Sequence, residues 1–190
     1  METYRLFAAI RPTEPVIEAL TRLQKGVDGA RWSGAEKLHV TLGFFGDVKG
    51  DQAELLDQEL AKIRQSAFSL SLSGVGHFGR GKPHSIWAGV DDNLSLSQLH
   101  KAIKAAAERA GIILERRDYR PHVTLAYFGA HPDIARIAKF EARHHDFKTA
   151  PFMVDQFWLY SSWQRKRGSN LYKAEASYPL LGRKATSFPK

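Results

Sequence analysis

Apolar residues along this chain recur with two different spacings, and the resulting segments favour strands over helices. Alternating or continuous runs of β-branched and aromatic residues predict strands at 4–10, 38–46, 68–76, 85–90, 121–129, 152–163 and 171–180. Apolar positions three and four apart predict helices between Thr13 and Gly26, from about Asp51 to Gln65, from about Asn93 to Ala110, and from His131 to Lys139. Strands in the majority, with several short connections, are typical of the α+β class with largely antiparallel sheets.

The chain shows no linker or low-complexity segment that would separate independent domains. We therefore expect residues 1–190 to form one domain. The predicted elements of its first part run β-α-β-α-β-β. A division near residue 91 gives two halves, 1–91 and 92–190, which we expect to form two lobes.

A nine-residue phrase occurs twice, as LHVTLGFFG at 38–46 and as PHVTLAYFG at 121–129. Six of the nine positions are identical, and the copies lie 83 residues apart. Each copy is rich in β-branched and aromatic residues and ends on a glycine. Each therefore predicts a strand that runs into a turn.

Side chains two apart on a strand share one face of the sheet. In the first copy His39 and Thr41 are therefore expected on one face. Val40 and Leu42 are expected on the other, buried face. The second copy repeats this arrangement.

In that second copy His122 and Thr124 share one face, and Val123 and Leu125 lie behind them. A single pair of this kind is most simply a hydrogen-bonded structural pair. Packing alone would preserve the apolar pattern of a repeat, but not the same two polar residues in the same register. We therefore interpret the two copies together as one functional site.

Duplicated halves often pack about a pseudo-twofold axis, which would bring both His-x-Thr faces to one cleft. Two imidazoles and two hydroxyls around one point suit acid–base chemistry on a phosphate. One histidine accepts a proton while the other donates one, and the hydroxyls donate hydrogen bonds to phosphate oxygens. The residues alone do not say which histidine has which role, but the scheme predicts a bell-shaped pH–rate profile.

The formal net charge of +8 favours a polyanionic partner, such as nucleic acid or a phosphorylated ligand. A basic surface without a specific role is the alternative. The chain has no cysteine, which excludes disulfides and thiolate chemistry. No apolar run approaches the roughly 20 residues needed to cross a bilayer, and the N-terminus lacks the features of a signal peptide. We expect a monomer in the cytoplasm, without membrane association.

The motifs at 39–42 and 122–125 resemble those of the 2H phosphoesterase superfamily. Within it, the chain is similar to the bacterial and archaeal RNA 2′,3′-cyclic phosphodiesterases, also called 2′-5′ RNA ligase-like proteins. The resemblance covers nearly the whole chain. It includes RLFAAI at 5–10, GKPHSIWAGV at 81–90, and the closing segments FWLYSS and LYKAEASYPL.

This resemblance implies two similar lobes around a V-shaped cleft. It also implies opening of a 2′,3′-cyclic phosphate to a 2′-phosphate without a metal or other cofactor. By the same resemblance His39 is the proton donor and His122 the proton acceptor, and Thr41 and Thr124 hold the phosphate oxygens. The expected partner is RNA with a 2′,3′-cyclic phosphate end, or a small cyclic nucleotide.

The sequence departs from the family at one position. Many members carry arginine in the frame HxTLxR, where this chain has Tyr127. Another cation must then balance the phosphate charge, and arginine suits the role because its fork grips two oxygens. The candidates are Arg80, Lys82, Arg117, Arg120, Arg165 and Arg167, although any one of them is more simply a solvated surface charge.

Aromatic side chains near the motifs are candidates for stacking a base. At strand spacing either Phe44 or Phe45 must be buried. The wider set is Phe44, Phe45, Trp87, Trp158, Tyr160 and Trp163, most of which belong to the expected core. The candidate substrate contacts are Arg120, Phe45, Tyr127 and Trp87.

Three other functions are weighed against cyclic-phosphate hydrolysis. Joining of RNA ends through a 2′-5′ linkage would use the same site in reverse. A non-catalytic RNA-binding module fits the charge and the aromatic residues, but it does not explain two matched His-x-Thr faces. A metalloenzyme lacks support, because the sequence contains no H-x-H, H-E-x-x-H or carboxylate pattern.

Overall fold

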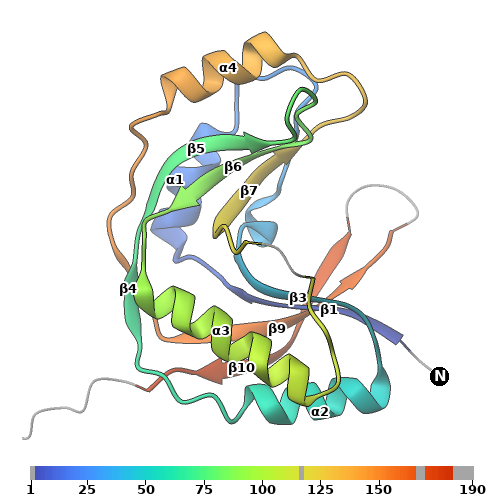
Figure 1. The fold of residues 1–190 in the computed structure, drawn as a ribbon. Helices are drawn as coiled ribbons and strands as arrows, with labels where there is room; N and C mark the ends of the chain where they lie inside the picture. The colour runs from blue at the N-terminus through green and yellow to red at the C-terminus, as the bar shows by residue number, and fades with distance from the viewer. Residues whose placement is uncertain (1–2, 116–117, 166–169, 182–190) are drawn as a thin grey trace, which may run out of the picture.

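The computed structural model describes residues 3–115, 118–165 and 170–181 (Figure 1). The helices are α1 (Glu14–Leu23), α2 (Gly50–Leu60), α3 (Leu94–Arg109) and α4 (Ile134–Arg143), with a short 3₁₀ helix η1 (Ala35–Lys37). The strands are β1 (Thr3–Ile10), β2 (Arg31–Trp32), β3 (Val40–Lys49), β4 (Phe68–Leu70), β5 (Leu72–Phe78), β6 (Ser85–Val90), β7 (His122–Tyr127), β8 (Phe152–Val154), β9 (Gln156–Trp163) and β10 (Leu171–Pro179).

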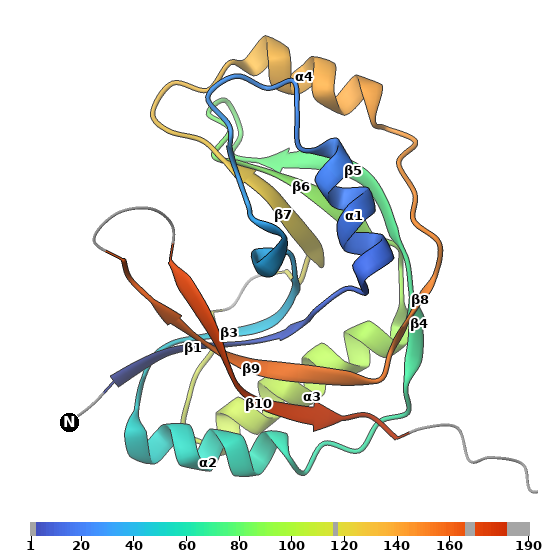
Figure 2. The same ribbon diagram turned by 180° about the vertical axis from the view of Figure 1, so that it is seen from behind.

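Within the described residues the strands form an eight-stranded sheet in the order β10-β9-β1-β3-β7-β6-β5, with β2 added against β7, and a two-stranded sheet of β4 and β8. Neighbouring strands are antiparallel. The large sheet divides into two lobes. In both views β5, β6 and β7 lie with α1 and α4, and the other strands of the large sheet, apart from β2, lie with α2 and α3 (Figures 1 and 2). The predicted α+β class with antiparallel sheets and two lobes is confirmed. The lobes are not the expected halves 1–91 and 92–190, because β5 and β6 of the first half lie with β7 of the second. No helix in the described part of the chain is long and apolar enough to span a membrane.

The two lobes join where the two copies of the repeated phrase meet. β3 and β7 pair at a single residue of each strand, Val40 with Val123, and both valines are fully buried. Beyond this pair β3 continues with β1 in one lobe, and β7 continues with β6 in the other. The junction therefore lies between the two predicted functional motifs.

The order of elements repeats over most of the chain. The series β1-α1-β3-α2-β4-β5 is followed by β6-α3-β7-α4-β8-β9, apart from the small elements β2 and η1. The two series exchange strands, because β5 pairs with β6, β9 pairs with β1, and β4 pairs with β8. The boundary between the series falls between β5 and β6, ahead of residue 91, and each lobe contains strands from both series.

Four predicted elements differ from the observed ones. The predicted strands 68–76 and 152–163 are each divided in two, because β4 and β8 pair with each other outside the large sheet before the chain enters it. The predicted helix 51–65 ends at Leu60. The predicted helix 131–139 begins at Ile134, after Asp133 caps the backbone N–H of Arg136, and continues to Arg143.

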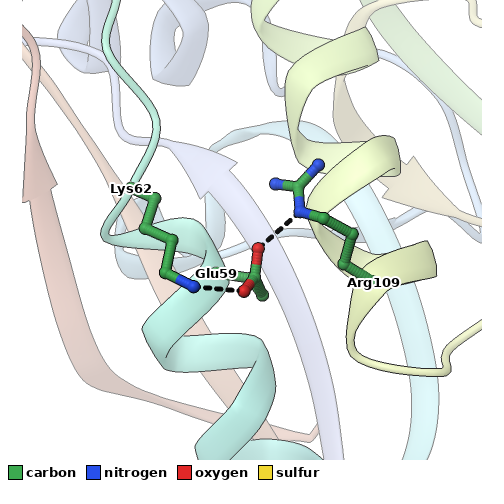
Figure 3. A network of polar contacts seen from close by, with 3 residues as sticks. All are labelled: Glu59, Lys62 and Arg109. Atoms are coloured by element: carbon green, nitrogen blue, oxygen red, sulfur yellow. Dashed lines mark hydrogen bonds and ion pairs between the residues drawn. The ribbon is translucent and has the colours of Figure 1, made fainter.

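Helices α2 and α3 pack against each other through apolar side chains, with a small polar network at one end. Glu59 accepts hydrogen bonds from Lys62 Nζ and Arg109 Nε, both at 2.5 Å (Figure 3). Hydrogen bonds from Arg109 and then Lys62 lower the pKa of Glu59. Exposed ion pairs contribute little to stability, whereas fully buried leucines contribute much more. The apolar contacts of α2 are therefore expected to hold it in place.

Adjacent leucines on α2 provide a test of this view. Leu56 is fully buried and Leu55 is 50% exposed. Leu56→Ala should lower the free energy of unfolding by about 2–5 kcal/mol, because it leaves a cavity. Leu55→Ala should change it by less than about 1 kcal/mol. Urea denaturation of both variants measures the difference, and equal losses would contradict the described packing of α2.

Candidate active site

The valine pair at the junction brings the four polar side chains of the two motifs together. In an antiparallel pair with Val40 opposite Val123, Thr41 lies opposite His122 and His39 lies opposite Thr124. The valines and leucines of both motifs are at most 1% exposed, whereas both histidines and both threonines are less buried. The predicted alternation of faces is thus present in both copies.

A β-bulge follows the threonine in each copy. On β3, Thr41 pairs with Ala9 and Gly43 with Ala8, which leaves Leu42 as an extra residue. Leu125 is the extra residue at the same place on β7. β-bulges are over-represented beside active sites because they redirect the side chains that follow them.

The bulges decide which aromatic residues face the cleft. Phe44 and Tyr127, five residues after the respective histidines, are 40% and 47% exposed. Phe45, predicted as a substrate contact, is 8% exposed and packs in the core. That prediction is wrong, because strand alternation shifts at each bulge.

A cleft of about 960 Å³ lies between the lobes. It is lined by both His-x-Thr pairs and by Phe44 and Tyr127. The sequence therefore predicted correctly that the two motifs meet in one cleft. Arg120, another predicted contact, lines it as well.

Both histidines are held in the same way by a backbone carbonyl two residues earlier. Nδ1 of His39 lies 2.6 Å from the carbonyl oxygen of Lys37, and Nδ1 of His122 lies 2.7 Å from that of Arg120. Because a carbonyl only accepts, each Nδ1 carries a hydrogen and donates it. This bond orients each ring and leaves Nε2 as the nitrogen for proton transfer.

His39 lies in an aromatic environment. Its ring centroid is 5.0 Å from that of Phe7, and Tyr172 approaches edge-on at 5.6 Å. Burial, together with a smaller contribution from the charge of protonated His122, lowers the pKa of His39 to about 4, and the hydrogen bond to the carbonyl of Lys37 opposes this shift. In the free protein His39 is therefore neutral at pH 7.

His122 has different neighbours. Phe78 approaches its ring edge-on at 4.8 Å, and Trp87 lies 6.4 Å away. Trp87, predicted as a substrate contact, is not among the described residues that line the cleft. Its ring covers Gly76, where an added Cβ would lie 2.4 Å from the indole. Trp87 therefore packs beside His122 instead of opening into the cleft.

The backbone of the first motif is supported by two side chains that the sequence gave no reason to select. The hydroxyl of Tyr119 donates to the carbonyl of Thr41 at 3.0 Å, and Nδ1 of His100 donates to that of Leu42 at 2.7 Å. The two rings stack with centroids 3.8 Å apart and an interplanar angle of 2°. Burial raises the pKa of Tyr119, so its hydroxyl remains a donor.

The second motif is supported instead by Gln24, at the end of α1, and by Ser33, directly after β2. The carbonyl of Leu125, which corresponds to Leu42, accepts from the backbone N–H of Ser33 at 2.8 Å and from Gln24 Nε2 at 3.2 Å. The two halves of the site are therefore similar in their His-x-Thr pairs and different in what holds them. Only the first half uses side chains that themselves line the cleft.

The cations of the cleft differ from most of those predicted. Arg5 and Lys104 line it with Arg120, although neither was predicted. Of the other candidates, Arg80, Lys82 and Arg165 do not line the cleft, and Arg117 and Arg167 lie outside the described residues. Among the described residues, no group of three or more His, Asp or Glu side chains is placed to hold a metal ion.

Comparisons with known proteins find matches that cover most of this chain. Residues 5–165 match the family described as the 2′-5′ RNA ligase superfamily. A Geobacillus stearothermophilus protein named RNA 2′,3′-cyclic phosphodiesterase is 31% identical over 191 residues, covering 96% of this chain and 59% of that protein. This chain thus spans less than two thirds of that relative.

Two further similarities cover most of both chains. A Thermotoga maritima protein of the same name is 30% identical over 167 residues, covering 83% of this chain and 86% of that one. The crystal structure of E. coli LigT complexed with 3′-AMP has a TM-score of 0.75 and 26% identity, and the match covers 94% of this chain and 99% of that one. The likeness therefore extends over both lobes.

The environment of His39 predicts an unusual titration. NMR of ¹⁵N-labelled histidine should show His39 gaining its proton near pH 4, below the ordinary value of about 6.5. A His39→Gln variant identifies the signal. A midpoint near 6.5 would contradict the described burial of this ring.

The same shift has a consequence for stability. Between about pH 6.5 and 4 the unfolded chain binds a proton at His39 that the folded protein does not, so stability falls as the pH is lowered through this window. Wild type should lose up to about 3 kcal/mol relative to His39→Gln, as measured by urea denaturation at both pH values.

Proposed function

The chain belongs to the 2′-5′ RNA ligase superfamily, and on this premise we propose that it hydrolyses RNA 2′,3′-cyclic phosphate ends to 2′-phosphomonoesters. The observation that carries the proposal is the meeting of two His-x-Thr pairs in one cleft, with Nδ1 of each histidine bound to a carbonyl. The relatives named RNA 2′,3′-cyclic phosphodiesterase support the same reaction.

The proposed reaction needs one proton acceptor and one proton donor. Nε2 of His122 takes a proton from a water molecule, whose oxygen forms a new bond to phosphorus. The bond from phosphorus to the 3′-oxygen breaks, and Nε2 of His39 gives its proton to that oxygen. The hydroxyls of Thr41 and Thr124 donate to the non-bridging oxygens, and the phosphate remains on the 2′-oxygen.

The lowered pKa of His39 places a condition on this scheme. A proton donor must be protonated before the reaction, yet His39 is neutral at pH 7 in the free protein. The negative charge of a bound phosphate favours the protonated imidazole. We therefore infer that substrate binding is accompanied by proton uptake at His39.

Arg120 is proposed as the cation that balances the phosphate. Its side chain lines the cleft, and its carbonyl orients His122. Tyr127, which occupies the position of the family's arginine, is proposed to contact the substrate without supplying charge.

All of these groups come from a single chain, so we propose that residues 1–190 act as one bilobal unit and as a monomer. We propose the cytoplasm as its location.

A second proposed function, supported by the family described as 2′-5′ RNA ligases, is the joining of RNA ends. A 5′-hydroxyl would replace the water molecule, and the same histidines would move the protons. Adding an RNA with a 5′-hydroxyl to the assay and looking for joined product distinguishes the two outcomes.

The principal test uses an RNA oligonucleotide with a 2′,3′-cyclic phosphate end, in the presence of EDTA. Wild type should produce a 2′-phosphate. His39→Ala and His122→Ala should each lower kcat/KM by about 10²- to 10⁴-fold, because each removes a positioned acid or base. His145→Ala is the matched control, since His145 is exposed and lies outside the cleft.

Full activity in both cleft variants would rule out the two-histidine reaction. Activity that is lost in EDTA and restored by a metal ion would point to a different mechanism. Tight binding of the RNA without turnover would favour the alternative that the protein is a non-catalytic RNA-binding module.

Tyr119 gives a further prediction about the first motif. Tyr119→Phe keeps the ring stacked on His100 but removes the hydrogen bond to Thr41. We expect kcat to fall about fivefold with a smaller change in KM, because one hydrogen bond of about 1 kcal/mol positions the Thr41 backbone. Steady-state kinetics of Tyr119→Phe and of wild type measure the effect.

Tyr178→Phe is the matched control. It removes a comparable hydrogen bond, from Tyr178 to Asp57 at 2.5 Å, and Tyr178 does not line the cleft. It should lower stability without changing kcat. An equal kcat for both variants and wild type would mean that the hydroxyl of Tyr119 does not position the site.

A further inference from the structure

A second, smaller hollow opens beside the cleft. Its volume is about 300 Å³, and its walls include Arg5, Asp47, Ser162 and Trp163. Arg5 and Ser162 also line the cleft. The hollow and the cleft therefore share a wall, and a chain leaving the cleft on this side enters the hollow.

The hollow lies a short distance along β1 from the catalytic groups. Phe7 on this strand contacts His39, with ring centroids 5.0 Å apart. Arg5 is two residues further along the strand on the same face, which corresponds to about 7 Å. Leu6 pairs with Ser161 on β9, so the strand register places Arg5 opposite Ser162 and Tyr4 opposite Trp163.

The side chains of this region combine a cation with exposed aromatic rings. The guanidinium of Arg5 lies 5.5 Å above the ring of Phe44, which faces the cleft. Trp163, which lines the hollow together with Arg5, is 45% exposed. The region therefore offers a cation and two exposed aromatic rings, the groups found in surfaces that bind single-stranded nucleic acid.

Trp163 is held in one orientation by polar contacts. Its Nε1–H donates to Ser161 Oγ at 2.7 Å, and that hydroxyl donates to Glu175 at 2.6 Å. An exposed indole that is fixed in this way loses little conformational entropy when a ring stacks on it. This arrangement favours a binding role over simple exposure at the end of a strand.

We propose that this hollow binds the nucleotide on the 5′ side of the one that carries the cyclic phosphate. Trp163 stacks its base, and Arg5 binds the phosphate that links the two nucleotides. The carboxylate of Asp47 accepts hydrogen bonds from a base amino group or a ribose hydroxyl, and it disfavours a second phosphate deeper in the hollow. The preferred substrate is then an RNA end, not a cyclic mononucleotide. This inference rests on the proposed function.

The test compares kcat/KM for 2′,3′-cyclic AMP with that for a tetranucleotide ending in the same cyclic nucleotide. Trp163→Ala should lower the value for the tetranucleotide by about 5- to 100-fold, the range expected for one stacked base. The value for cyclic AMP should not change. Trp163→Phe should restore part of the loss, because it keeps an aromatic face.

Leu171→Ala is the matched control. Leu171 pairs with Trp163 across the hairpin, is 52% exposed, and lines neither the hollow nor the cleft. It should leave both substrates unaffected. Equal losses for both substrates, or no loss for the tetranucleotide, would overturn the proposed subsite.

If wild type turns over neither substrate, the proposed function fails while the subsite remains testable. Binding of a tetranucleotide with a 3′-phosphate, compared with 3′-AMP by calorimetry, then measures the hollow directly. The proposal expects tighter binding of the tetranucleotide, reduced by Trp163→Ala. Equal affinities of wild type and variant for it would overturn the subsite as well.

Discussion

The site depends on one pair of residues. Val40 and Val123 are the positions at which β3 and β7 pair, and both are fully buried. Because side chains alternate along a strand, burying these valines against the core forces the histidine and threonine on either side of each into the cleft. A shift of this pairing by one residue would bury the polar groups and expose the valines. The same pair both joins the lobes and aligns the two His-x-Thr pairs.

A symmetric frame holds two chemically different histidines. Both are oriented by a carbonyl two residues earlier, yet Phe7 and Tyr172 surround His39 while Phe78 and Trp87 flank His122. Acid–base catalysis needs this difference, because identical groups in identical surroundings would favour the same protonation state. The repeat supplies the positions, and the residues around it give the two histidines different surroundings.

Much of this site follows from the sequence because it depends on local periodicity. The exposed faces of the two motifs, and their meeting in one cleft, were predictable from the alternation and the repeat. The bulges at Leu42 and Leu125 were not, because a bulge is defined by register with a neighbouring strand, so the choice of Phe45 over Phe44 was wrong. The support from Tyr119 joins residues 78 positions apart and leaves no local signal.

The exchange of strands between the two series of elements bears on the origin of the chain. β5 of the first series pairs with β6 of the second, and β9 of the second pairs with β1 of the first as well as with β10. A chain of one series would therefore leave strand edges open, and it would carry one His-x-Thr pair. Two copies of such a chain, paired about a twofold axis, would close the edges and assemble the site at once. The present protein is what fusion of that homodimer into one polypeptide would produce, and fusion is the step that frees the two histidines to diverge.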